Sequence, residues 1–249
     1  MSERGEVYTH EDGPVRLVIM NRPDRKNAMT PPMLEAMLAE IERCGREGKA
    51  LVVAGHGDVF CAGFDMKMVH DDWRVLGALL RGLSAVIRAM RRMDSPVVVA
   101  AHGAAVAGGC ALLGGGDMAL TDQAAKLGYP VVKLGVSPAV NGASLANNMG
   151  FGRARERMLD PGLIDGREAL RTGLVQVCCD IREDVIPTSV RWAKKMAGLE
   201  PTAWAATKRH LNEIEGSAAD EQFEKSLAAS MGLVGTKDQI ERVAGLWAG

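Results

Sequence analysis

The sequence lacks the features that would place it in several large classes of protein. Its 30 basic and 31 acidic side chains leave a formal charge of -1, which argues against a nucleic-acid binder that relies on phosphate neutralisation. No apolar run approaches the roughly 20 residues that span a bilayer, and the N-terminus lacks the apolar core of a signal peptide. We therefore expect a soluble, cytoplasmic protein with neither a nucleic-acid nor a membrane partner.

Cysteines are few and show no functional spacing. The five cysteines form neither a disulfide framework nor a spaced Cys/His zinc set, and they lie at Cys44, Cys61, Cys110, Cys178 and Cys179. A phosphate loop is also missing, because no segment spells Gly-x-Gly-x-x-Gly or a Walker motif with its lysine. We expect no metal ion. A nucleotide-binding α/β protein is a remote alternative, because the sequence lacks the phosphate loop that such proteins use.

What the sequence does contain is an alternation of strand and helix patterns. The chain of 249 residues is 47% hydrophobic, which is enough for one substantial core. Short apolar runs at 15–20, 50–54 and 97–101 predict buried strands. Between them, apolar residues recur with helical period over 34–41 and 76–90. This order predicts an α/β fold in which helices cover a largely parallel sheet.

Three capping patterns predict where helices begin. Thr30 precedes two prolines, which suit the first turn of a helix. Near the C-terminus, Ser217 precedes Asp220 by three residues, and Thr236 precedes Gln239 by three.

The pattern changes in the last quarter of the chain. Strand signals fade beyond about Asp180, and the last sixty or so residues read as helical. We expect a core domain at 1–190 that contains the site, and a helical lobe at 191–249 that serves oligomerisation or closure of the site.

Two glycine-containing turns follow apolar runs. They are Cys61-Ala62-Gly63-Phe64-Asp65 and the stretch 103–110. A strand that enters such a turn and then a helix leaves backbone N–H groups without partners. One amide from each turn could polarise a carbonyl and stabilise an enolate or a tetrahedral oxyanion. The alternative is structural, with glycines that only permit close packing.

Several segments together resemble the crotonase (enoyl-CoA hydratase/isomerase) superfamily in order and spacing. The similar segments are 21–29, 60–67, 101–117, 127–138, 165–177 and 235–239. The resemblance implies a spiral of ββα turns with a helical C-terminal lobe. It also implies trimers that often pair into hexamers, and a site for coenzyme A thioesters that uses no metal or redox cofactor.

Position by position, the resemblance implies roles for particular residues. Phe64 and Gly108 would supply the two backbone amides of an oxyanion hole. Ala62 and the stretch of Asp65, Met66 and Lys67 would line the path of the CoA adenine and pantetheine. Arg25, Lys26 and Lys67 would contact phosphate, and the alternative for these three cations is a solvated surface.

Two departures from the family pattern concern proton transfer. Where hydratases of this family have two glutamates, this chain has Ala111 and Val131. Neither side chain can move a proton, which argues against ordinary hydration of an enoyl-CoA. Some relatives have an Asp in the next loop, but this chain offers only Ser137 and Asn141 there, and neither is a base at neutral pH.

Other polar side chains are candidates for contact with a substrate. His70 could act as a base if it points inward, and the alternative is an exposed position on a helix. Tyr129 could donate a hydrogen bond, Asn141 could offer a polar contact, and Lys133 could offer a charge. We expect His102 to be a core histidine and Asp117 to have a structural role.

Two hypotheses of different classes follow. The first is an acyl-CoA-binding enzyme of the crotonase fold that stabilises a thioester enolate, with decarboxylation or isomerisation favoured over hydration. Decarboxylation fits because loss of carbon dioxide itself generates the enolate. The second is a catalytically silent CoA-binding or scaffolding subunit that kept the fold after losing its glutamates. The sequence does not determine the acyl group.

Overall fold

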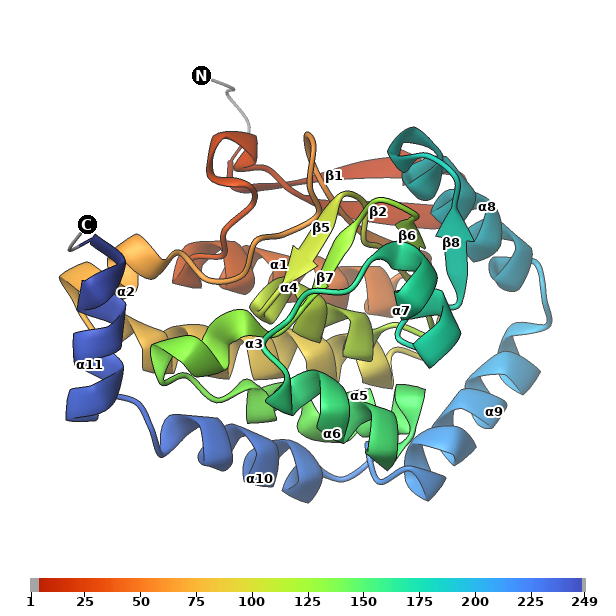
Figure 1. Ribbon diagram of the computed structural model, residues 1–249. Coiled ribbons are helices and arrows are strands. Elements are labelled where there is room, and N and C mark those ends of the chain that lie inside the picture. The colour runs from red at the N-terminus through yellow and green to blue at the C-terminus, as the bar shows by residue number, and fades with distance from the viewer. Residues whose placement is uncertain (1–4, 248–249) are drawn as a thin grey trace.

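The computed structural model describes residues 5–247, and a sheet of six strands lies at its centre (Figure 1). In spatial order the strands are β1 (Val7–Asp12), β2 (Val15–Met20), β3 (Ala50–Gly55), β4 (Val97–Ala100), β6 (Met118–Asp122) and β8 (Val177–Cys179). Only β1 is antiparallel to its neighbour, and every other pair is parallel. The predicted α/β class and its largely parallel sheet are confirmed.

Helices cover both faces of this sheet. Helices α1 (Pro31–Arg46) and α3 (Val75–Arg92) pack on one face, and α8 (Val185–Ala197) packs on the other. Alternate residues of each strand therefore enter different cores. Val18 of β2 belongs to the core under α1 and α3, whereas Leu17 belongs to the core under α8. This burial on both faces explains why the strands read as continuous apolar runs.

A second, smaller sheet pairs β5 (Ala104–Val106) with β7 (Lys126–Gly128) in parallel. Strand β5 follows β4 and leads into the short helix α4 (Gly108–Ala111). Strand β7 follows β6 in the same way and leads into the 3-10 helix η3 (Pro130–Leu134). The amide of Ala107 donates to the carbonyl oxygen of Gly128 at 2.8 Å, so the loops that follow β5 and β7 lie side by side.

Two of the three predicted helix caps are present. The hydroxyl of Thr30 accepts a hydrogen bond from the Met33 amide at 3.1 Å and begins α1. Thr236 accepts one from the Gln239 amide at 3.4 Å and begins α11 (Lys237–Ala244). The prediction for Ser217 is wrong: its hydroxyl donates to the carboxylate of Glu215 at 2.6 Å and no amide three residues ahead donates to it. Helix α10 (Asp220–Met231) begins after Ala219 instead.

The chain beyond β8 is helical, as the sequence predicts. Helices α9 (Pro201–Ile214), α10 and α11 run along the outside of the molecule, and α11 ends beside α2 (Met66–Asp71) (Figure 1). The predicted boundary at residue 190 lies inside α8, which packs on the main sheet, so a division into two domains stays a prediction. The remaining helical elements are η1 (Pro23–Arg25), η2 (Leu112–Gly115), η4 (Pro138–Asn141), α5 (Gly142–Met149), α6 (Phe151–Leu159), α7 (Gly166–Thr172), η5 (Arg182–Asp184) and η6 (Gly245–Trp247). No helix within residues 5–247 is both long and apolar enough to cross a membrane.

Two ion pairs attach α9 and the turn after it to the core. The ammonium of Lys208 lies 2.8 Å from a carboxylate oxygen of Asp117, and the same oxygen accepts a hydrogen bond from the Val97 amide at 2.7 Å. Arg91 of α3 binds both carboxylate oxygens of Glu215 at 2.6 Å. Asp117 thus has the structural role that the sequence predicts.

Candidate active site

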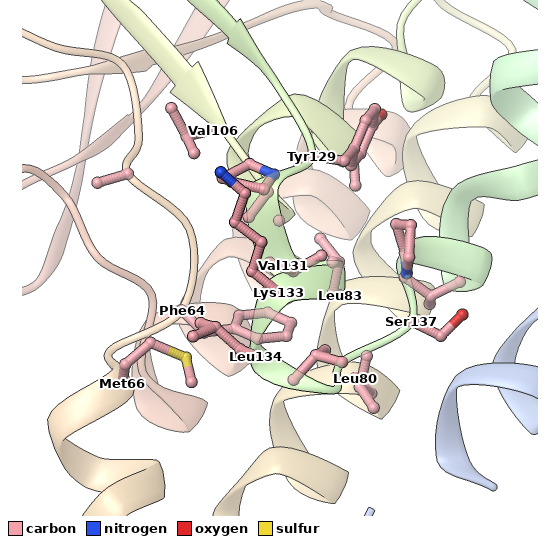
Figure 2. A pocket seen from close by; sticks show the side chains of 18 of the residues that line it. Phe64, Met66, Leu80, Leu83, Val106, Tyr129, Val131, Lys133, Leu134 and Ser137 are labelled. Atoms are coloured by element: carbon pink, nitrogen blue, oxygen red, sulfur yellow. The ribbon is translucent and has the colours of Figure 1, made fainter. Parts of the chain in front are cut away.

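A largely apolar cavity of about 290 Å³ lies between the turns that follow β5 and β7 (Figure 2). Helix α3 contributes Leu80 and Leu83 to its wall, and Leu246 reaches it from the C-terminal end of the described chain. The other lining residues are Ala62, Phe64, Met66, Val106, Ala107, Gly108, Ala111, Tyr129, Pro130, Val131, Lys133, Leu134, Val136, Ser137, Pro138 and Val140. Both candidate oxyanion-hole residues are therefore at this cavity.

Backbone pairing brings the two glycine turns together. Cys61 forms an isolated bridge with Ala105, with the Cys61 amide donating to Ala104 at 3.0 Å and the Val106 amide donating to Cys61 at 3.0 Å. Gly63 has a φ of +103°, a conformation that L side chains rarely adopt. A Cβ there would also lie 3.7 Å from the amide nitrogen of Gly108. The first turn thus lies directly against the start of α4.

The amides of Phe64 and Gly108 have no hydrogen-bond acceptor within residues 5–247. On either side of Phe64, the Gly63 carbonyl accepts from Met29 at 2.8 Å and the Asp65 amide donates to Met29 at 2.9 Å. The neighbours of Phe64 are thus paired, while its own amide is not. A buried N–H group without an acceptor is unfavourable, so two such groups beside one cavity are a place where a carbonyl oxygen can bind.

Gly108 permits a close approach that no larger residue would. A Cβ at this position would lie 2.6 Å from the Met29 side chain and 3.1 Å from the Phe64 ring. The ring of Phe64 therefore packs against Gly108. Figure 2 shows the same ring as part of the cavity wall.

The two positions where the resemblance predicts glutamates in hydratases lie on the cavity wall. Ala111 and Val131 line it, and within the described chain no Asp, Glu or His side chain does. The polar side chains of the lining are Tyr129, Lys133 and Ser137. The cavity can therefore bind and polarise a carbonyl, but it offers no carboxylate or imidazole for proton transfer.

Tyr129 and Asn141 form a buried pair behind the cavity. The Tyr129 hydroxyl accepts a hydrogen bond from the Asn141 amide at 2.7 Å, and both residues are at most 1% exposed. Burial and the neighbouring Cys110 raise the pKa of Tyr129 well above its ordinary value, so its hydroxyl stays protonated. Tyr129 lines the cavity, whereas Asn141 supports it from behind.

The cysteines beside the turns are packing residues. Burial raises the pKa of Cys61 to about 12 and that of Cys110 to about 11, so both are protonated thiols at neutral pH. His102 is 3% exposed and its Nε2 lies 3.0 Å from the carbonyl oxygen of Gly57, so it is the core histidine that the sequence predicts.

The structure places His70 away from the cavity. Its ring stacks on Trp247 with 4.7 Å between the ring centroids, and it lines a separate surface hollow beside Asp71 and Asp72. This stacking connects α2 to the C-terminal end of the described chain.

The predicted CoA-contacting residues lie on adjoining loops. Ala62 and Met66 line the cavity, whereas Asp65 accepts a hydrogen bond from Arg22 at 2.9 Å and so connects the two loops. Arg25 and Lys67 are solvent-exposed, and Lys67 pairs with Asp71 of its own helix at 3.0 Å.

Three further residues lie near the cavity or on the loops beside it: the predicted cation Lys26, and Arg22 and Leu246, which the sequence did not single out. Lys26 is exposed in a left-handed turn with φ of 51°. Sequence reasoning missed Arg22, whose partner lies 43 positions away, and Leu246, which reaches the cavity only through the folding back of α11. Neither residue belongs to a local pattern that would single it out.

These observations define an α/β protein with a mainly parallel sheet, in which two paired glycine turns border one apolar cavity. The model of the enoyl-CoA hydratase/isomerase family matches residues 10–242 of this chain. The chain belongs to this family, whose fold is the crotonase fold.

Individual relatives agree with this assignment. The chain is 31% identical to a probable enoyl-CoA hydratase of Rhizobium meliloti, over 96% of this chain and 93% of that protein. It is 29% identical to a putative enoyl-CoA hydratase of Thermus thermophilus, over 94% of each. A crystal structure of an enoyl-CoA hydratase/isomerase from Mycobacterium paratuberculosis superposes with a TM-score of 0.86 at 26% identity, over 96% of this chain and 98% of that one.

Proposed function

We propose that this protein binds an acyl-CoA thioester and holds its carbonyl oxygen at the amides of Phe64 and Gly108. The observation that carries the proposal is the pair of unengaged amides on the wall of one apolar cavity. As negative charge develops on the thioester oxygen, preorganised N–H donors stabilise it, often by roughly 3 kcal/mol per donor. The product of such stabilisation is an enolate or a tetrahedral oxyanion.

Classical hydration fits this cavity poorly. Addition of water to an enoyl group needs a base to activate the water and an acid to protonate the α-carbon. Ala111 and Val131 can do neither, and no other lining residue of the described chain offers a carboxylate. We therefore favour a lyase or isomerase type of reaction over hydration.

Decarboxylation requires the least from the protein. The bond between the α-carbon and the carboxylate breaks, carbon dioxide leaves, and the electron pair remains as the enolate at the two amides. The α-carbon then takes a proton from solvent. Isomerisation is the second possibility, but it requires a base to remove a proton from carbon. The reaction uses backbone dipoles, and we expect it to need neither a metal nor a redox cofactor.

The CoA portion would follow the loops beside the cavity. We propose that Ala62 and Met66 contact the pantetheine, and that Asp65 keeps this path open through its ion pair with Arg22. Arg25, Lys26 and Lys67 are exposed and accessible to phosphate, which would compete with Asp24 for Arg25 and with Asp71 for Lys67.

We also propose that the chain assembles as a homotrimer or a pair of trimers. Large apolar side chains are exposed in two regions outside the cavity, at Phe151 and Leu159 of α6 and at Leu211 and Ile214 of α9. Burial of such surfaces between subunits is favourable. Light scattering on the purified protein measures the assembly directly.

Single-turnover mass spectrometry tests the proposed reaction. The full-length protein is incubated with malonyl-, methylmalonyl- and enoyl-CoA thioesters in the presence of a chelator, beside calorimetry with plain CoA. We expect a decarboxylated or isomerised product and little hydrated product. Binding without any product supports the second hypothesis, a catalytically silent CoA-binding subunit. The observation that favours this hypothesis is the presence of Ala111 and Val131 where the resemblance predicts glutamates. Failure to bind any CoA species contradicts both.

A further inference from the structure

Lys133 is the one charged side chain that lines the cavity within the described residues. It begins on η3, and Figure 2 shows it extending across the cavity toward Val106. The rest of the wall is almost entirely aliphatic or aromatic, so an ammonium group there has few polar neighbours. Lys133 itself is solvent-exposed, so its ammonium lies at the open side of the cavity, beside this apolar wall.

No side chain of the described protein satisfies this charge. The lysine ammonium has neither an ion pair nor a hydrogen bond within residues 5–247. The acid that feels its charge is Asp160, whose carboxylate already binds Arg157 at 2.6 Å and the Gly162 amide at 2.8 Å. The nearby guanidinium of Arg242 binds only the Lys133 carbonyl oxygen, at 3.4 Å.

We propose that Lys133 binds a carboxylate on the acyl group, so that the protein selects CoA thioesters of dicarboxylic acids. The proposal rests on the proposed function, because it requires the thioester end to lie at Phe64 and Gly108. The CoA phosphates are the other possible anion, but exposed cations on the adjoining loops are available to them at Arg25 and Lys67. Lys133 is the cation that extends across the cavity, so it is placed to meet a charge on the acyl group.

The selected carboxylate is one that the substrate keeps. A cation beside a carboxylate that leaves as carbon dioxide stabilises the reactant more than the transition state, and so opposes its loss. A carboxylate at the far end of the acyl chain has no such conflict. The lysine is then a specificity-determining residue for the acyl group.

Calorimetry with a matched pair of thioesters tests this selection. Glutaryl-CoA and pentanoyl-CoA have five acyl carbons each and differ by a carboxylate in place of a terminal methyl group. We expect wild-type protein to bind glutaryl-CoA at least about tenfold more tightly, as for hydrogen bonds to charged groups. Lys133→Met should abolish the preference, and Lys133→Arg should keep most of it. Lys126→Met, at an exposed lysine of β7, is the matched control and should retain it.

Each other outcome overturns the proposal. Equal binding of the two thioesters by wild-type protein, or a preference that survives in Lys133→Met, shows that Lys133 does not read the acyl group. If Lys133→Met weakens both CoA thioesters equally and leaves the corresponding pantetheine thioesters unaffected, the lysine binds phosphate. If neither thioester binds to wild-type protein, the proposed function fails as well, so the two failures are distinguishable.

Discussion

The aromatic ring of Phe64 packs against Gly108, so that a Cβ on the glycine would lie 3.1 Å from the ring. Each residue presents an unengaged amide to the same cavity. The position of one donor therefore depends on the size of the other residue. This relationship makes Gly108 the most sensitive position of the proposed oxyanion hole.

Gly108→Ala should reduce turnover of an accepted thioester by about a hundredfold, the loss typical of one displaced oxyanion-hole donor. The added methyl group would lie 2.6 Å from the terminal methyl group of Met29 and 3.1 Å from the Phe64 ring, so these side chains or the turn must shift. Gly152→Ala is the control, because a Cβ there meets nothing within 4 Å. Single-turnover rates and circular dichroism on both variants separate lost catalysis from lost folding. Unchanged turnover in Gly108→Ala would remove this amide from the mechanism.

Ala111→Glu with Val131→Glu should create hydratase activity. Both positions line the cavity, and general acid-base catalysis contributes roughly a hundredfold to ten-thousandfold. We expect hydration of crotonyl-CoA to rise at least about a hundredfold in the double variant, measured as loss of the enoyl absorbance. The matched control is the double glutamine variant, which has similar bulk but transfers no proton. Equal rates in the two double variants would contradict the interpretation of these positions.

Lys208→Met should destabilise the protein by about 3 kcal/mol, because it leaves the carboxylate of Asp117 without its partner near the core. The Lys208 side chain is 7% exposed and its ammonium lies 2.8 Å from that carboxylate. Urea unfolding measures the change. Lys225→Met removes a 75% exposed lysine with only a surface partner and should change stability by no more than about 0.5 kcal/mol. Similar losses in both variants would show that the buried pair contributes nothing specific.

Glu215→Gln should make the free energy of unfolding depend less on pH in the acid range. Burial raises the pKa of Glu215, but hydrogen bonds from Arg91 and Ser217 outweigh it and hold the pKa below the ordinary value of 4.5. The pKa of Glu215 is lower in the folded protein than in the unfolded protein, so its carboxylate stabilises the fold at pH values above the unfolded pKa. This stabilisation is lost as the pH falls through the folded pKa. We expect Glu215→Gln to be less stable by about 1–2 kcal/mol at neutral pH and to lose less between about pH 5 and 3.

Glu213→Gln, two residues earlier near the end of α9 and 70% exposed, is the control for this pH experiment. Its stability curve should run close to that of the wild-type protein. Urea unfolding across the pH range gives all three curves. If Glu215→Gln ran parallel to the wild-type curve, its carboxylate would not be linked to folding.

Local patterns predicted those elements that are decided by neighbouring residues. Thr30 and Thr236 begin helices because each hydroxyl reaches an amide three residues ahead. Ser217 has the same pattern but is not a cap, because the chain stays in a turn through Ala218, whose amide donates to the Asn212 carbonyl oxygen, and the helix begins only after Ala219. A capping pattern predicts a helix start only where the following backbone is helical, and contacts with distant residues decide that.

The sequence likewise predicted some residues of the candidate site correctly and misplaced others. The two glycine turns and the substituted glutamate positions could be found from the order of residues, and the structure brings Phe64, Gly108, Ala111 and Val131 to one cavity. His70 was a plausible base on sequence grounds, yet it stacks on Trp247 outside that cavity. The direction in which a side chain on a short helix points depends on what packs against it, which no local pattern contains.

The sequence alone determined the class of fold, because apolar periodicity records which face of each strand and helix is buried. It also determined that positions 111 and 131 carry Ala and Val and so no carboxylate, since a residue type needs no coordinates. Only the tertiary structure decided that, among residues 5–247, the amides of Phe64 and Gly108 have no acceptor and Lys133 extends across their cavity without a partner. Those properties depend on contacts between segments far apart in the chain, where packing rather than local preference sets the geometry.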